Sequence, residues 1–316
     1  MLLKLPAYDR YYFGKMLENT ITRCELPKEI DFEALSTPMR IVRNVLINPI
    51  ANFLPAGISK ALLKFGKSQL AEANWTEPGG WKSMVISYNG QCKQIADRIL
   101  VKAGTVPKAL RNRKRLVIWI LSKLINQGHL KYPHILCLGA GPGLTVIEAI
   151  SQARLPVRAT LVDLNDEPFE YGMRIARQYG VDNRVRFIKA DVREIEKYLH
   201  EPPGIVEMIG LCEYLQDDQI AMIVRAVAQL MPADASIIFN SVYPSHGVDR
   251  FLRQVFGLRM MYRSTERLCQ LMQQAGFGEF QTYAEPMSVY EVCIGKKINP
   301  DINLREDYLT EAIEVG

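Results

Sequence analysis

The sequence predicts an α/β fold: a doubly wound, mostly parallel seven-stranded sheet with a C-terminal antiparallel hairpin, preceded by an N-terminal helical cap. From residue 131 onward, short apolar runs alternate with helical patterns, which is typical of a parallel sheet covered by helices on both faces. A glycine-rich turn, Gly-Ala-Gly-Pro-Gly at residues 139–143, follows the first apolar run. The last two runs are joined by four residues, too few for a crossover helix, so they form the hairpin.

Residues 1–130 lack this alternation and predict a cap of five or six short helices. Apolar helical patterns at 41–53 and 58–65 are broken by prolines. A helix is expected from residue 82 to about 102, after a turn at 78–80. The segment 108–125 predicts a helix whose basic first turn is solvated and whose apolar second half is buried against the sheet.

Residues 131–297 predict the α/β domain, and residues 298–316 an acidic C-terminal segment. The boundaries follow from short apolar runs that end at Gly, Asp or Asn, with helical patterns between them. The expected strands are 134–138, 159–162, 185–190, 205–210, 236–240, 279–284 and 289–295. The expected helices between them are 145–152, 167–178, 217–230 and 265–275.

The glycine turn is the main candidate for a nucleotide-type site. Gly139, Gly141 and Gly143 let the backbone reach positive φ and let a ligand approach closely. The helix that follows offers free N–H groups to an anion. Leu144 stands where a dinucleotide fingerprint has its third glycine, and Pro142 lies inside the loop, so a nicotinamide or flavin enzyme is the less favoured alternative.

Two acids close the next strands. Asp163 follows the second strand and Asp191 the third. In a doubly wound sheet, an acid at the end of the second strand reaches ribose hydroxyls. Each acid could also be a helix N-cap or a solvated loop residue.

These features together resemble the class I S-adenosylmethionine (SAM) dependent methyltransferase superfamily over about residues 131–297. The resemblance rests on residues 138–143, 162–163, 190–191 and 210–215. It implies SAM as the cofactor. It also implies that the three loop glycines line the methionine moiety, that Asp163 binds the ribose diol, and that Asp191 and Val192 hold the adenine. Cys212, after the fourth strand, is counted with this cofactor-binding set.

Catalytic candidates follow from position, because ligands of open α/β sheets lie beyond the carboxyl ends of the strands. The turns after the fourth and fifth strands supply Tyr214, Asn240 and Tyr243. Glu213, Ser241 and His246 are close to them in sequence. The cap supplies Tyr88 and Asn89, with Tyr11, Tyr12 and Trp75 as further aromatics, which either form a lid that closes over the ligand or fill the core of the cap. No metal site is expected.

The favoured function is transfer of the SAM methyl group, by in-line displacement, to a small-molecule acceptor, free or carrier-bound, in biosynthesis. An alternative within the same fold is transfer or cyclisation of the aminobutyryl arm with release of methylthioadenosine, as in nicotianamine and azetidine-2-carboxylate synthases. A second alternative is a non-catalytic, RNA-binding relative.

Charge is divided unevenly along the chain. The net charge of +5 combines +11 over residues 1–130 (20 basic, 9 acidic) with −6 over residues 131–316 (19 basic, 25 acidic). Such asymmetry could serve an acidic partner: RNA, a membrane surface or an acyl carrier protein. We expect instead that the basic half packs on the acidic domain, with no specific nucleic-acid partner. A homodimer is left open.

The sequence favours a cytoplasmic setting. Six scattered cysteines without CxxC spacing read as reduced thiols rather than disulfides or a zinc site. No stretch has the roughly 18–20 apolar residues of a membrane span. The apolar start of the chain, Met-Leu-Leu-Lys-Leu, is too short for a secretory signal.

Overall fold

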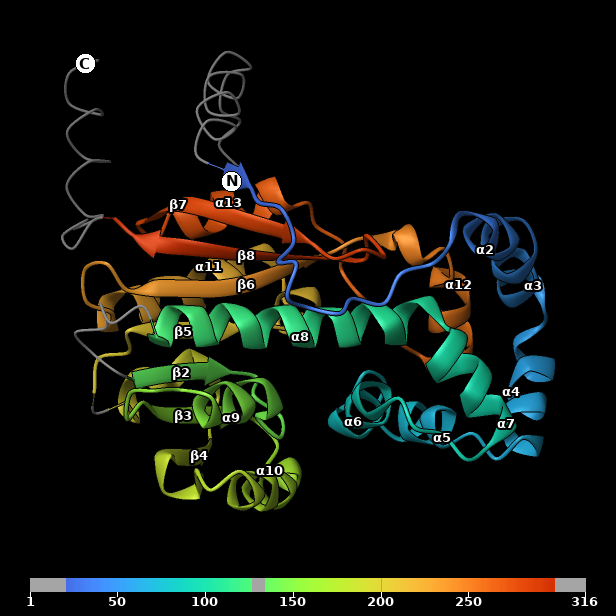
Figure 1. Cartoon of the computed structure of the whole chain (residues 1–316), viewed down its shortest axis with the longest axis horizontal. Coiled ribbons are helices and arrows are strands. Elements are labelled where there is room, and N and C mark those ends of the chain that lie inside the picture. The colour runs from blue at the N-terminus through green and yellow to red at the C-terminus, as the bar shows by residue number, and fades with distance from the viewer. Residues whose placement is uncertain (1–20, 127–133, 200, 299–316) are drawn as a thin grey trace, which may run out of the picture.

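The computed structural model describes residues 21–126, 134–199 and 201–298. Its centre is an eight-stranded sheet in the order β1-β7-β8-β6-β5-β2-β3-β4 (Figure 1). The predicted α/β fold class is confirmed, with one strand more than expected. The strands are β1 (Ile21–Arg23), β2 (His134–Leu138), β3 (Arg158–Asp163), β4 (Val185–Lys189), β5 (Ile205–Met208), β6 (Ser236–Val242), β7 (Phe277–Ala284) and β8 (Tyr290–Lys297).

Strand pairing sets the position of the site. β2 lies between β3 and β5, and all three run parallel, as do β4 beside β3 and β6 beside β5. β8 is antiparallel to both β6 and β7, which confirms the predicted hairpin. The additional strand β1 pairs parallel to β7, with Ile21 opposite Phe280. Three residues are too few for sequence alternation to reveal a strand.

Helices cover both faces of the sheet. One face carries α8 (Thr105–Asn126), α9 (Leu144–Ser151) and α10 (Glu167–Gln178), whose apolar sides form a core with β2, β3 and β5. The other carries α11 (Asp217–Leu230), α13 (Thr265–Gln273) and the 3₁₀ segment η4 (Val192–Lys197). Short turns complete the domain: η3 (Asp182–Arg184), η5 (Cys212–Tyr214), η6 (Pro244–His246), α12 (Asp249–Phe251) and the π-helical η7 (Leu252–Phe256).

From residue 37 to residue 103 the chain is helical and lies beyond the carboxyl ends of the strands (Figure 1). It comprises α2 (Thr37–Val42), η1 (Arg43–Ile47), α3 (Asn48–Phe53), α4 (Ala56–Phe65), α5 (Gln69–Thr76), α6 (Trp81–Asn89), α7 (Ile95–Asp97) and η2 (Arg98–Ala103). The expected helix from 82 to 102 was too long, because Gly90 ends α6 in the left-handed region (φ +64°). Tyr11, Tyr12 and residues 299–316 lie outside the described residues.

No single helix of the described residues is long and apolar enough to cross a membrane. The two arms Thr37–Phe53 and Ala56–Phe65 reach that length and composition only together, and they are bent by 99°.

Helix α8 departs from its prediction, because its basic first half is buried. The guanidinium of Arg111 donates to both carboxylate oxygens of Glu33, at 2.6 and 2.8 Å. It also donates to the carbonyls of Ser87 and Val101, at 2.9 and 3.1 Å. These partners come from the N-terminal segment, from α6 and from η2. Multiple hydrogen bonds offset the cost of burying a charge, so the first turns of α8 are interior rather than solvated.

The next residue extends this network to the sheet. Asn112, fully buried, accepts from the Glu33 backbone N–H at 2.8 Å and donates to the Glu33 carbonyl at 2.8 Å. Its amide also donates to the Glu285 carboxylate at 3.1 Å, in the turn between β7 and β8. Glu285 in turn accepts from the backbone of Met287 and Val289. Helix α8 therefore joins the cap to the hairpin through polar side chains.

Replacing Arg111 by Met should lower the free energy of unfolding by about 2–4 kcal/mol. The Glu33 carboxylate and two backbone carbonyls would lose their hydrogen-bond donor in a partly buried site. Arg115→Met is the matched control, since Arg115 meets the same Glu33 at 3.5 Å from an exposed position. Its cost should be about 0–1 kcal/mol. Urea unfolding of both variants compares them, and equal losses would contradict the role given to Arg111.

Candidate cofactor and acceptor site

The glycine turn has the geometry that the sequence predicts. Gly139, Gly141 and Gly143 all have positive φ, of 66°, 51° and 67°. A Cβ built on Gly143 would lie 2.4 Å from the Leu161 side chain, so that position admits only glycine. A Cβ on Gly141 would meet nothing nearer than Trp81, at 3.8 Å. The loop is therefore tight against the sheet but open on the side of Gly141.

Asp163 lies beside this loop at the end of β3. One carboxylate oxygen accepts from the Gly141 N–H at 2.8 Å, and the other from the Asn165 N–H at 3.0 Å. Sequence reasoning missed a second support, Gly172 of α10. A Cβ there would lie 2.4 Å from the Pro142 carbonyl oxygen. Because α10 packs this closely, the loop is held from outside as well as by Asp163.

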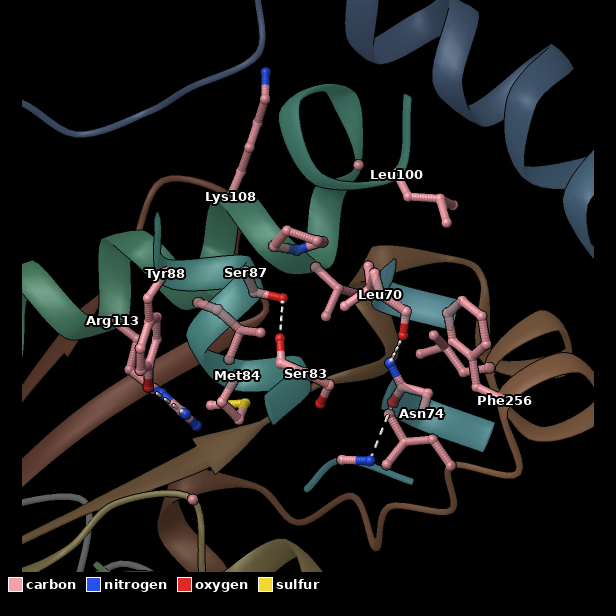
Figure 2. A pocket seen from close by; sticks show the side chains of 18 of the residues that line it. Leu70, Asn74, Ser83, Met84, Ser87, Tyr88, Leu100, Lys108, Arg113 and Phe256 are labelled. Carbon is pink, nitrogen blue, oxygen red and sulfur yellow. Dashed lines mark hydrogen bonds between the residues drawn. The ribbon is translucent and has the colours of Figure 1, made fainter. Parts of the chain in front are cut away.

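A cavity of about 730 Å³ extends from the glycine loop into the cap. Gly139, Ala140, Gly141, Pro142 and Asp163 line its end at the sheet. The rest of the wall is mostly apolar and comes from α3, α6, η2, α8 and η7. Figure 2 shows part of this wall, with Met84, Leu100 and Phe256 among the side chains drawn. The apolar residues on this wall include Leu46, Ile47, Ile50, Leu70, Met84, Val85, Ile99, Leu100, Val106 and Leu110 from residues 1–130, and Phe251, Leu252 and Phe256 from α12 and η7.

One side of the cavity is polar and charged. Arg113 of α8 and Glu213 of η5 both line it and are almost fully buried, with a nitrogen–oxygen distance of 3.4 Å. The guanidinium lies 4.4 Å from the Tyr290 ring centre and donates to the Tyr88 hydroxyl at 3.4 Å (Figure 2). The second oxygen of Glu213 is buried without a hydrogen-bond partner among the described residues. A buried acceptor without a donor on a cavity wall marks a place for a ligand group.

The residues at the sheet end fit SAM. Glycines without side chains leave space above the loop, and the Asp163 carboxylate is placed to accept from hydroxyls. Trp81, which sequence reasoning did not select, lines the same cavity beside Gly141. Its indole N–H donates to Glu167 of α10 at 3.3 Å. No local signal could reveal Trp81, because its place depends on how the cap packs on the loop.

The predicted catalytic residues fall into two groups. Tyr88 and Tyr214 line the cavity. Asn89 is exposed and borders a separate hollow of about 230 Å³, because one helical step from Tyr88 turns it away. Asn240 is buried and accepts from the Gly210 N–H at 2.9 Å, so it supports the turn after β5. Tyr243 bonds Thr265 at 2.9 Å, away from the cavity.

Four residues of the expected cofactor set also lie off the cavity wall, and the first is Gly143, which packs against Leu161. Cys212 points into the core beneath η5, while the next residue, Glu213, faces the cavity. The Asp191 carboxylate is held by the guanidinium of Arg193, and Val192 is packed in the core. The lid candidate Trp75 donates to the Val255 carbonyl at 2.8 Å and packs in the interior of the cap. Side-chain direction at a turn, which sequence does not give, separates these residues from their neighbours.

Glu207 of β5 also lines the cavity, deep below the loop. Burial raises its pKa to about 7, although donation from the Cys137 thiol at 2.6 Å and the Thr145 hydroxyl at 3.3 Å opposes the shift. The folded state thus keeps a proton that the unfolded chain releases near its ordinary pKa of 4.5. The contribution of this carboxyl to stability is present below that pH and is lost as the pH rises to about 7.

Glu207→Gln should therefore gain stability relative to the wild type as the pH rises from about 4.5 to about 8, by about 3 kcal/mol at most. The amide keeps the shape of the side chain but cannot ionise. Urea unfolding of both proteins across this range measures the difference. Glu170→Gln, which removes an exposed carboxyl of α10, is the control. A difference between Glu207→Gln and the wild type that does not change with pH would contradict the raised pKa.

Comparison with known proteins bears on the cofactor and on the fold. Residues 88–297 match the family model Methyltransf_20, described as "Putative methyltransferase". No curated protein matches the chain. A Bordetella parapertussis structure described as a "possible exported protein" is similar with a TM-score of 0.58 and 12% identity, covering 77% of this chain and 97% of its own. Magnesium protoporphyrin IX methyltransferase from Synechocystis PCC 6803, with bound SAH, gives 0.53 and 13%, covering 77% and 99%.

At these identities the solved structures establish the fold alone, and the family match carries the assignment. That match spans more than half of the chain and includes the glycine loop, Asp163 and Glu213. The predicted cofactor, SAM, and the predicted transferase class are confirmed. The chain belongs to the Methyltransf_20 family and is a SAM-dependent methyltransferase.

Proposed function

We propose that this methyltransferase modifies a small, largely apolar acceptor that binds in the cap's part of the cavity. The observation that carries the proposal is one cavity of about 730 Å³ that joins the glycine loop to an apolar chamber, with Arg113 and Glu213 on its wall. Pockets of this size hold small molecules, and a few polar groups fix their orientation. SAM supplies an electrophilic methyl carbon bonded to a sulfonium.

Glu213 is the residue best placed to meet the acceptor's nucleophile. Its partner-free oxygen can accept a hydrogen bond from a hydroxyl or amine and take up the proton as the new bond forms. Arg113 holds the other oxygen and fixes the direction of the carboxylate. The Tyr214 side chain is partly exposed, but desolvation of its hydroxyl, followed by the charge of Glu213, raises its pKa above the ordinary value, so the phenol stays neutral and can donate. Geometry, more than acid strength, is what these groups provide.

The apolar walls exclude water from the reacting groups. A dry site does not oppose this reaction, because the positive charge of the sulfonium is dispersed in the transition state. Trp81 and Tyr88 place aromatic rings on the same wall. Such rings attract a sulfonium by about 0.5–2 kcal/mol each. The reaction is proposed to take place in the cytoplasm, as a step in biosynthesis.

Mass spectrometry separates methyl transfer from the alternatives. Methyl transfer predicts S-adenosylhomocysteine that forms only when acceptor from a cell extract is added to protein and SAM. Methylthioadenosine from SAM alone would indicate use of the aminobutyryl arm and would overturn the proposal. The family match supports neither that alternative nor an RNA-binding relative. RNA binding should be weak, non-specific and steeply dependent on salt.

Asp163→Ala should weaken SAM binding by about 1.5–3 kcal/mol, because a charged acceptor and the support of Gly141 are lost together. Gly141→Val should abolish binding, since the side chain would enter the cavity at a position with φ +51°. Asp166→Ala, which removes an exposed carboxylate paired with Lys189, is the control and should bind normally. Calorimetry measures all three, and unchanged affinity in the first two would refute the site.

Glu213→Gln and Tyr88→Phe should each reduce turnover at least tenfold, about 1.4 kcal/mol of barrier, with SAM affinity nearly unchanged. Tyr88→Phe should also keep the melting temperature, because only one hydroxyl on the cavity wall is lost. Tyr243→Phe is the control, since its hydroxyl bonds Thr265 away from the cavity. If all three variants keep full turnover, the polar wall has no catalytic part.

A further inference from the structure

The outer helices of the cap expose an unusual amount of apolar surface. Of the 18 large hydrophobic side chains exposed among the described residues, 13 lie on α2–α4, α7, η1 and η2. These helices form the right-hand end of the molecule in Figure 1. So many exposed apolar side chains on neighbouring helices are uncommon in monomers and mark an interaction site. We call it the outer apolar face: Met39, Ile41, Val42, Val45, Leu46, Ile47, Ile50, Phe53, Ile58, Leu62, Phe65, Ile95 and Ile99.

The polarity of α3 is inverted relative to a helix on the surface of a water-soluble protein. Its inner side carries Asn48, which is buried and donates to the His246 carbonyl at 3.2 Å. Asn52 donates to the Gly247 carbonyl at 2.8 Å. On its outer side Phe53 is 72% exposed. Polar side chains attach the helix to the catalytic domain, and apolar ones face outward.

Helix α4 repeats this arrangement. Ser59 is buried, whereas Ile58, Leu62 and Phe65 are exposed, the last by 90%. An amphipathic surface helix normally turns its apolar side to the core. Two successive helices with the opposite polarity indicate an environment outside the protein that is itself apolar.

The stretch of chain that carries most of this face has charge of one sign. Residues 34–71 contain five basic and no acidic side chains. Arg40, Lys60, Lys64 and Lys67 are exposed among the apolar residues. This combination is complementary to a surface that is apolar inside and anionic at its boundary.

The cavity and the outer apolar face share residues. Met39, Leu46, Ile47, Ile50 and Ile99 are exposed, and all five line the cavity. The apolar chamber therefore opens on this face. A molecule that entered there would pass between apolar side chains from outside to the glycine loop.

We propose that the outer apolar face docks on the surface of an anionic phospholipid bilayer, and that the acceptor enters the cavity from the lipid. The entry of the acceptor rests on the proposed function, whereas the docking does not. Neither arm of the 99° bend is long enough alone to cross a bilayer, so the arms lie in its interface. RNA would satisfy the basic residues but would leave the apolar ones in water.

The test uses the full chain and sedimentation with vesicles of phosphatidylcholine, with or without about 30 mol % phosphatidylglycerol. The protein should bind the anionic vesicles, and added salt should weaken binding. Val45→Asp with Phe53→Asp should reduce binding at least about tenfold. Lys60→Glu with Lys64→Glu should remove the preference for anionic lipid. Met222→Asp with Arg225→Glu, exposed on α11 across the sheet, is the matched control and should bind like the wild type.

SAM affinity and oligomeric state are measured for the same variants. SAM affinity by calorimetry shows whether each variant is folded and tests the cofactor site independently of docking. Light scattering reports the oligomeric state. A dimer that Val45→Asp with Phe53→Asp dissociates, without vesicle binding, would replace the bilayer by a second copy. A monomer that binds SAM but no vesicle would also overturn docking, while the proposed methyl transfer would stand.

Discussion

The structure depends on three consecutive polar side chains, Arg111, Asn112 and Arg113, that one helix carries into the interior. Each points in a different direction, as successive helical positions must. Arg111 holds the N-terminal segment through Glu33, Asn112 reaches the hairpin turn through Glu285, and Arg113 reaches the cavity wall. Because a buried polar group without a partner is costly, the three segments are fixed relative to one another. The cavity wall therefore depends on a helix that is polar where it is buried.

The sheet and the loop could be predicted because their signals are local. Alternating strands and helices can be recognised from short segments of sequence, and so can glycines between a strand and a helix. The three-residue strand β1 and the burial of Arg111 and Arg113 were not predictable in this way, since both depend on partners far along the chain. A cluster of basic residues reads as solvated unless its acceptors are known.

In the candidate site, too, residues with a local sequence signal could be predicted, and residues placed by long-range packing could not. The loop glycines and Asp163 were selected from motif and spacing; Gly139, Gly141 and Asp163 line one cavity, while Gly143 packs against Leu161. Tyr88 and Asn89 are neighbours in sequence, yet one lies in the cavity and the other borders a different hollow. Trp81 and Arg113 were missed because the cap has no motif, and its contribution arises from packing. Residues of a short glycine motif are therefore easier to place from sequence than residues whose position depends on how the cap packs.

The small strand β1 has a consequence for biosynthesis of the protein. Ile21 pairs with Phe280, and Cys24 donates to the Thr282 carbonyl, so the start of the described chain is bound to a strand made near the end. During translation these first residues have no partner until β7 has left the ribosome. The segment that carries Glu33 directly follows this strand. The ion pair between Glu33 and the buried guanidinium of Arg111 therefore forms either before the hairpin is made or together with it. The sheet edge at β7 can therefore be closed by β1 only after β7 has been made.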